Sequence, residues 1–215
     1  MGRTLLSPER RSKIKKTNIG RVIIFCEGKT EKYYFDYFAE IIKKNKYTDI
    51  KVEIKTADGN AKTVLNYADN FLIEEKNNRK YSNYGKYLAF DCDDPTDIQE
   101  VICASQEGKY DLLISNCMFE TWLLMHFEDV DEKLTKRKTY SRLSSHLHNK
   151  YIKGHKGKTR EIIQNGDIEK AIDNASALEK LYYSQGMNLF TSIKKMNPYT
   201  SVYKLVEQFM AEISG

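Results

Sequence analysis

Hydrophobic residues in the first 130 positions follow two alternating patterns. Short apolar stretches of strand length, bounded by polar or glycine-containing segments, predict β-strands at residues 21–26, 50–56, 86–90 and 110–115. Apolar residues spaced three or four positions apart, or a fully apolar segment in the last case, predict helices at residues 31–44, 62–76, 97–105 and 119–127. This alternation predicts an α/β fold with a central, largely parallel sheet flanked by helices.

The pattern changes after residue 130. Residues 131–165 are basic and punctuated by glycine, which indicates an insertion or lobe. Further helices are predicted at 167–184 and 199–213, and the second follows Asn197-Pro198 in the manner of a helix cap and first turn. We therefore expect four regions: a basic N-terminal arm at 1–20, an α/β core at 21–130, a basic and mostly helical lobe at 131–165, and C-terminal helices at 166–215 that pack on the core.

The composition is that of an ordinary folded domain. Of the 215 residues, 40% are hydrophobic and 30% are charged, which excludes disordered and collagen-like chains. No apolar run approaches the roughly 20 residues that span a bilayer, and no signal peptide opens the chain, so we expect a cytoplasmic protein without a membrane partner. The four cysteines lack C-x-x-C spacing, so we expect small core residues and neither a zinc site nor disulfides.

Charge is unevenly distributed along the chain. The net charge is +5, yet residues 1–20 carry +5 and residues 131–160 carry +8, which leaves −8 for the remainder. An acidic body with two basic segments indicates nucleic acid as a partner for the basic parts and a cation, such as a metal, for the acidic part. The alternative is that each basic segment is a solvated tail or loop. The candidate contacts to a phosphate backbone are Lys29, Lys136, Arg137, Lys138, Lys153, Lys156, Lys158 and Arg160.

Acidic residues stand where three of the predicted strands end. Glu27 follows the first strand, Asp91 and Asp93 follow the third, and Glu120 lies in the first turn of the helix after the fourth. Ligands of open α/β sheets bind beyond the carboxyl ends of the strands. Asp91 and Asp93 are two positions apart, so an extended chain points both side chains the same way. Such carboxylates suit Mg²⁺ or Mn²⁺, although Asp and Pro at positions 93–95 are also typical of a turn and helix cap.

Glu120 has an argument of its own. If Asn116 caps the helix, Glu120 shares a helical stripe with Leu124 and Phe127, and its carboxylate faces partly apolar surroundings. Such a group needs a metal, a basic side chain or the N–H groups of the helix start as its partner. A purely structural role at the helix start is the alternative.

A phosphate-binding loop of the NTPase type is excluded. Gly28-Lys29-Thr30 matches the end of G-x-x-x-x-G-K-T, but Ile23 stands where the first glycine is required. The sequence also contains no G-x-S-x-G motif for a nucleophilic serine.

Four short blocks combine these strand ends and acids in a particular order. They are IFCEGKTE (24–31) followed by Tyr34-Phe35, FDCDD (90–94), SNCMFETWLLMHF (115–127), and NPYT (197–200) followed by Val202 and Leu205. In this order they resemble the RloB/AbiLii family, and they cover the chain from about residue 20 to residue 210. The series is more specific than any one block. Cys117 departs from the family pattern, which has proline there, so the presentation of this helix start is left open.

The resemblance implies a TOPRIM-like fold, in which a glutamate follows the first strand and a D-x-D pair follows a later one. It implies that Glu27 is the family's acid and that Asp91 and Asp93 bind a metal, with Glu31 and Glu120 as further acids of the catalytic site. It also implies a nuclease-like component of phage defence by abortive infection, often encoded beside an ABC-type ATPase.

These observations lead to the hypothesis of a nuclease that depends on Mg²⁺ or Mn²⁺. RNA, with tRNA as one candidate, is preferred to DNA on the resemblance alone. Asp91 and Asp93 would hold the metal, while Glu27 would complete its shell or move a proton. The alternative is a non-catalytic nucleic-acid-binding or regulatory subunit of an ABC-type ATPase complex. Topoisomerase or primase chemistry is disfavoured, because the chain has no room for accessory domains.

Overall fold

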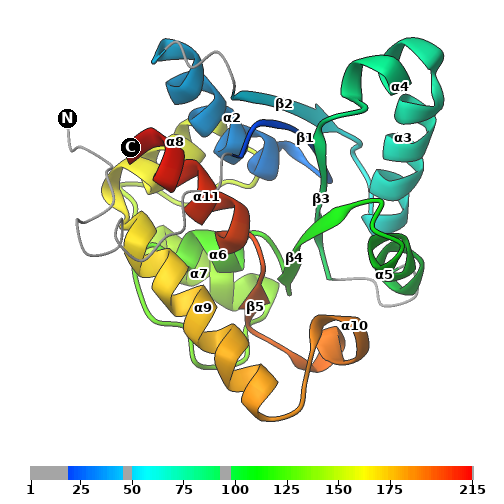
Figure 1. The fold of residues 1–215 in the computed structure, drawn as a ribbon. Coiled ribbons are helices and arrows are strands. Elements are labelled where there is room, and N and C mark those ends of the chain that lie inside the picture. The colour runs from blue at the N-terminus through cyan, green and yellow to red at the C-terminus, as the bar shows by residue number, and fades with distance from the viewer. Residues whose placement is uncertain (1–18, 46–49, 93–97, 215) are drawn as a thin grey trace.

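A five-stranded sheet forms the centre of the computed structural model (Figure 1). The structure describes residues 19–45, 50–92 and 98–214. The strands are β1 (Arg21–Cys26), β2 (Lys51–Thr56), β3 (Gly85–Asp91), β4 (Asp111–Asn116) and β5 (Tyr199–Thr200). Their order is β2-β1-β3-β4-β5; the first four run parallel, and β5 pairs with β4 in the antiparallel direction. The predicted α/β class with a largely parallel sheet is confirmed.

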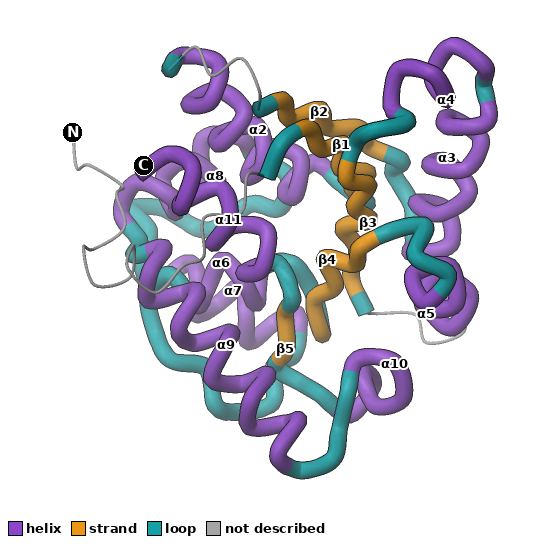
Figure 2. Tube along the Cα trace, in the orientation of Figure 1, coloured by secondary structure: helices purple, strands orange, loops and turns teal. Residues whose placement is uncertain are grey.

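Helices cover both faces of this sheet (Figures 1 and 2). One face carries α2 (Lys29–Lys44), α6 (Glu120–Met125), α7 (Lys136–Ser145), α8 (Lys156–Asn165), α9 (Ile168–Ser184) and α11 (Tyr203–Ser214). The other carries α3 (Ala61–Ile73), α4 (Glu75–Tyr81), α5 (Ile98–Gln106), α10 (Leu189–Ser192) and the 3-10 helix η1 (Ile193–Lys195).

The strands contribute side chains to two hydrophobic clusters, because successive residues of a strand face opposite sides of the sheet. In β1, Val22 and Ile24 belong to the cluster under α2 and α6, whereas Ile23 and Phe25 belong to the cluster under α3 and α5. All four side chains are fully buried. The continuous apolar run of β1 is therefore the consequence of a strand that is covered on both faces.

Two predicted helices differ from the observed ones. The helix predicted at 62–76 consists of α3 and α4, which meet at Glu74. The helix predicted at 199–213 begins only at Tyr203, because residues 199–200 form β5 after a cis Asn197–Pro198 peptide bond. Ser201 extends the attachment to β4: its Oγ accepts from the Ile114 amide at 3.0 Å and donates to the Leu112 carbonyl at 2.8 Å.

The basic segment predicted as a lobe packs into the larger core. Its two helices, α7 and α8, bury Leu143, Ile162 and Ile163 in the same cluster as α2 and α6. Helix α8 packs against α2, and α7 packs against α6. Residues 1–18 of the predicted N-terminal arm lie outside the described residues.

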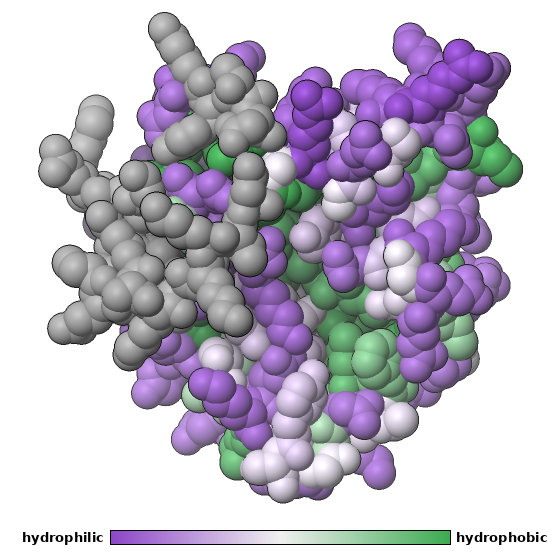
Figure 3. All heavy atoms as spheres, in the orientation of Figure 1, coloured by the Kyte–Doolittle hydropathy of each residue, from purple (hydrophilic) through white to green (hydrophobic). Residues whose placement is uncertain are grey.

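The cysteines agree only in part with the expected core positions. Cys26 and Cys92 are buried, Cys117 is half-buried and Cys103 is exposed; in the described structure none of the four forms a disulfide. No helix in the described part of the chain has both the length and the apolar character that a membrane crossing requires. The surface in Figure 3 is mostly hydrophilic, with hydrophobic residues gathered in a hollow between β4 and α10.

The start of α9 offers a test of local stability. Asp167 caps this helix: its Oδ1 accepts from the Lys170 amide at 3.0 Å. We expect Asp167→Ala to lower the free energy of unfolding by about 1 kcal/mol, because a donor at the helix start loses its acceptor. Asp167→Asn, which retains a capping oxygen, should stay close to the parent. Urea denaturation measures both, and equal losses for the two variants would contradict a capping role.

Candidate active site

Four acids gather at the carboxyl edge of the sheet. Glu27 follows β1, Asp91 ends β3, Glu31 lies in the first turn of α2 and Glu120 begins α6. Glu27 Oε2 accepts a hydrogen bond from the Asp91 amide at 3.0 Å, which joins the two neighbouring strand ends directly. Exposure is 1% for Glu31, 2% for Asp91 and 0% for Glu120, so three of the carboxyl groups lie out of bulk water. Asp93, the second half of the predicted pair, lies outside the described residues.

Asp91 connects the strand end to the start of α6. Its Oδ1 accepts from the Phe119 amide at 2.7 Å, whereas its Oδ2 is buried and has no hydrogen-bond partner within the described ranges. Asn116, considered above as a cap of this helix, does not cap it: Asn116 is the last residue of β4, and its side-chain amide donates to the Ile193 carbonyl at 2.7 Å. A tertiary contact replaces the local cap: the carboxylate of Asp91, on the neighbouring strand, accepts the hydrogen bond from the N–H group at the helix start.

Residues 151–154, here called the strap, lie across these acids between α7 and α8. The Tyr151 hydroxyl donates to Glu120 Oε1 at 2.7 Å. The Gly154 amide donates to Thr30 Oγ1 at 2.9 Å, at the start of α2. Lys153 Nζ lies 3.7 Å from Asp91 Oδ2. The strap therefore contacts three of the elements that position the acids.

Burial and the neighbouring carboxylates raise the pKa values of Glu31 and Asp91. Burial and then the charge of Glu120 raise the pKa of Glu31 to about 8. Burial, followed by the charges of Glu31 and Glu27, raises the pKa of Asp91 well above its ordinary value. Lys153 opposes both shifts. Burial lowers its own pKa, but the carboxylates outweigh this and hold the pKa of Lys153 above its ordinary value.

Comparison with known protein families assigns the fold to one of them. A family model described as RloB-like protein matches residues 22–209. The chain belongs to the RloB-like family. Neither a curated protein nor a solved structure matches it significantly. Membership of the RloB-like family suggests a role associated with phage defence.

The donor chemistry of this RloB-like site fits a hard divalent cation. Asp91 Oδ2 and Glu120 Oε2, like Glu31 Oε2, are buried and have no hydrogen-bond partner among the described residues. Carboxylate oxygens are the ligands that Mg²⁺ and Mn²⁺ prefer. Within the described residues, however, no group of three or more His, Cys, Asp or Glu side chains is arranged to hold a metal. A complete ligand set would therefore combine Asp91 with Glu27 and with Asp93, which lies beyond the described ranges.

The predicted nucleic-acid contacts of the RloB-like chain fall into two groups. Most of those on α7 and α8 have an acidic partner, which reduces the charge they offer to a polyanion. The pairs are Lys138–Glu132, Lys156–Glu40 at 3.8 Å, Lys158–Glu161 at 2.7 Å and Arg160–Glu40 at 2.6 Å. Lys29 and Arg137, by contrast, are exposed and have no ion pair among the described residues.

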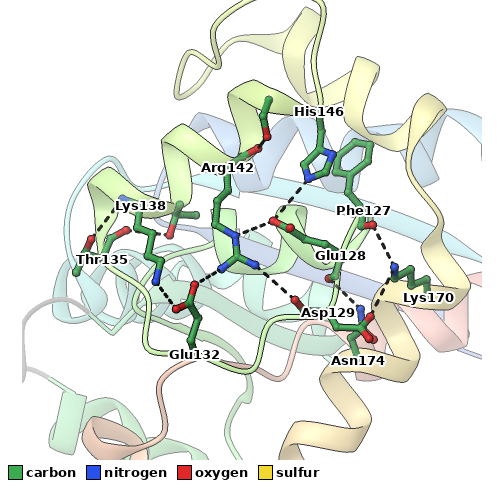
Figure 4. A network of polar contacts seen from close by, with 12 residues as sticks. Phe127, Glu128, Asp129, Glu132, Thr135, Lys138, Arg142, His146, Lys170 and Asn174 are labelled. Carbon is green, nitrogen blue, oxygen red and sulfur yellow. Dashed lines mark hydrogen bonds and ion pairs between the residues drawn. The ribbon is translucent and has the colours of Figure 1, made fainter.

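Figure 4 shows how the loop before α7 neutralises part of that helix. Arg142 Nε donates to Glu128 at 2.8 Å, and its Nη1 donates to Glu132 at 3.0 Å. Lys138 points to the same Glu132 carboxylate. The His146 ring stacks on Phe127 with 4.8 Å between ring centroids. The net positive charge counted along the sequence therefore overstates the basic surface of this segment.

Sequence reasoning placed Lys153 among backbone contacts and missed Tyr151, Thr30 and Gly154. The contact between Gly154 and Thr30 joins residues 124 positions apart. Tyr151 is one of 15 tyrosines, and nothing in its local sequence distinguishes it. A signal for Thr30 is its position beside Glu31 in the first block of the resemblance.

Proposed function

We propose that this RloB-like protein is a metal-dependent phosphodiesterase that cleaves nucleic acid as an effector in phage defence. The observation that carries the proposal is the environment of Asp91. Asp91 Oδ2 is buried at the carboxyl edge of a parallel sheet and has no hydrogen-bond partner among the described residues. The Asp91 amide donates to Glu27, and Lys153 Nζ lies 3.7 Å from Asp91 Oδ2. A buried carboxylate oxygen without a hydrogen bond is costly unless a cation or a proton satisfies it.

Asp91 would hold the metal, with Glu27 and Asp93 as further candidate ligands. A bound Mg²⁺ or Mn²⁺ would act as a Lewis acid on a phosphate oxygen. Glu27 is half-buried and accepts the Asp91 amide with Oε2. Its carboxylate can also hold or move a proton at the attacking or leaving oxygen, which is the usual role of a positioned carboxylate.

Glu31 and Glu120 are proposed to support these residues. With a pKa of about 8, Glu31 carries a proton at neutral pH and leaves one fewer negative charge beside Asp91. The Tyr151 hydroxyl and Thr30 Oγ1 fix Glu120 Oε1 at 2.7 Å and 3.5 Å. Burial, followed by the charge of Glu120, raises the pKa of Tyr151 far above its ordinary range, so the hydroxyl remains a donor.

A cleavage assay with several polymers tests the proposal. The purified protein is incubated with labelled RNA, including tRNA, and with single- and double-stranded DNA, in Mg²⁺, in Mn²⁺ and in EDTA. We expect metal-dependent fragments, with RNA cut in preference to DNA. If an ABC-type ATPase is encoded beside the gene, the assay is repeated with it. Binding of Mg²⁺ without cleavage in any mixture would favour the non-catalytic regulatory subunit instead.

The affinity for nucleic acid gives a separate prediction. Replacing Lys29 and Arg137 together by Gln should weaken binding across sequences alike and flatten the salt dependence of the dissociation constant. The expected loss is about 0.7 to 0.9 log units of slope for each phosphate contact removed. Lys158→Gln is the matched control, because the Lys158 side chain is only 11% exposed and is paired with Glu161. An unchanged slope in the double variant would contradict a role of these two cations in nucleic-acid binding.

A further inference from the structure

The strap is anchored at both of its ends. At one end, the Tyr151 amide donates to Ser144 Oγ at 2.9 Å, and the Tyr151 ring lies 5.5 Å from that of Tyr140. At the other end, the Gly154 amide donates to Thr30 Oγ1. Gly154 has a φ of +67°, a conformation that side-chain-bearing residues rarely adopt. Lys153 lies between these anchors, so its side chain is presented from a fixed backbone.

Lys153 differs from the other cations of the basic segment in the partner that it has. Lys138, Lys158 and Arg160 pair with Glu132, Glu161 and Glu40, which are outside the acidic cluster. Lys153 instead approaches Asp91, whose side chain is 1% exposed, while 44% of its own side chain stays accessible. One end of the interaction is therefore buried among the acids, and the other is open to an incoming ligand.

The ammonium group and the carboxylate stand too far apart for a strong hydrogen bond. At 3.7 Å their attraction is mainly that of two charges, and Asp91 Oδ2 keeps its lone pairs free for a further cation. A phosphate group carries oxygens that can bind an ammonium group and a metal ion at the same time. The arrangement thus resembles one half of a two-cation site in which a lysine supplies the second charge.

We propose that Lys153 is the second cation of the active site: it shares Asp91 with the metal and binds the phosphate of the nucleic-acid substrate. The inference rests on the proposed function and narrows it to one metal assisted by a lysine. Lys153 is then a catalytic residue, and no longer one of several nonspecific backbone contacts.

Two consequences follow from placing a fixed positive charge beside a metal ligand. Lys153 repels the metal in the absence of substrate, so its neutralisation should tighten Mg²⁺ binding, by about tenfold for two charges a few ångströms apart at a partly exposed site. Neutralisation should also remove stabilisation of the charge that develops on the phosphate, which lowers turnover at saturating Mg²⁺ by about 100-fold. A residue that only held the backbone would weaken substrate binding but leave both the Mg²⁺ affinity and the turnover at saturating substrate unchanged.

The test compares Lys153→Gln, Lys153→Arg and Asp91→Asn with the parent. Melting temperature is recorded against Mg²⁺ concentration without substrate, since a metal that binds only the folded state raises it. We expect half-maximal stabilisation at about tenfold less Mg²⁺ in Lys153→Gln, parent-like behaviour in Lys153→Arg, and no response in Asp91→Asn. Single-turnover cleavage of RNA at saturating Mg²⁺ is the second measurement.

The outcomes separate the inference from the function on which it rests. If Mg²⁺ stabilises the parent and not Asp91→Asn, but acts on Lys153→Gln as on the parent, the inference is overturned and the metal site stands. If Mg²⁺ does not stabilise the parent, the proposed function loses its metal and the inference falls with it. Full turnover in Lys153→Gln would also overturn the inference.

Discussion

Replacing Asp91 with asparagine is expected to reduce Mg²⁺-dependent cleavage on the order of 10³-fold or more. Asparagine keeps the size of the side chain and an oxygen that can accept from the Phe119 amide, as Asp91 Oδ1 does at 2.7 Å. It removes the negative charge that a hard divalent cation requires, at Oδ2, for which the described part of the chain supplies no hydrogen-bond partner. Rates of cleavage and dissociation constants for the same RNA measure the effect, and binding should survive.

The stability of this variant distinguishes a metal ligand from a structural turn. Burial and the neighbouring carboxylates raise the pKa of Asp91, so its charged form is disfavoured in the folded protein. The melting temperature of Asp91→Asn in EDTA should therefore equal or exceed that of the parent. Asp111→Asn, at the exposed start of β4, is the matched control for the substitution itself. A marked loss of stability confined to Asp91→Asn would show that the carboxylate is needed for folding.

The sheet and two of its acids could be predicted because both depend on local pattern. A strand covered on both faces must be apolar throughout, as β1 is, and parallel strands bring their carboxyl ends to one edge. Glu27 and Asp91 follow neighbouring strands in this sense, and the structure joins them by a hydrogen bond of 3.0 Å. The sheet and the positions of Glu27 and Asp91 are therefore both encoded in short, local stretches of the sequence.

The rest of the site depends on contacts between distant segments. The amide of Phe119, just before α6, donates to the carboxylate of Asp91 and not to Asn116, although Asn116 is nearer in the sequence. The pairing of β3 with β4 brings the Asp91 carboxylate to this position. Lys153 and Asp91 are far apart in the chain, and their meeting depends on how α7 and α8 pack on the core. The net charge of residues 131–160 does not distinguish Lys153, which faces the acidic cluster, from Lys158, which forms an ion pair with Glu161.

The same packing explains why the acids can coexist in a buried position. Glu31, Asp91 and Glu120 are nearly inaccessible to water, and carboxylates held together in such surroundings repel one another. Two features of the chain reduce the net charge: the ammonium group of Lys153 and a proton on Glu31, whose pKa is about 8. The charge of the cluster, and hence its affinity for a cation, must then depend on pH near neutrality.

Glu31→Gln is therefore expected to raise the free energy of unfolding in EDTA, and the gain should grow with pH. The folded-state pKa of Glu31 is about 8, above its ordinary value of 4.5, so folding takes up a proton between these limits. The stability that the protonated carboxyl contributes is complete below about pH 4.5 and is lost as the pH rises to about 8. Glutamine cannot ionise, so the variant escapes this loss, which we place on the order of 2 kcal/mol at pH 8 for a group coupled to other acids. Urea denaturation at pH 5, 6.5 and 8 measures it, with Glu107→Gln as the exposed control; parallel pH dependences in parent and Glu31→Gln would contradict the protonated state.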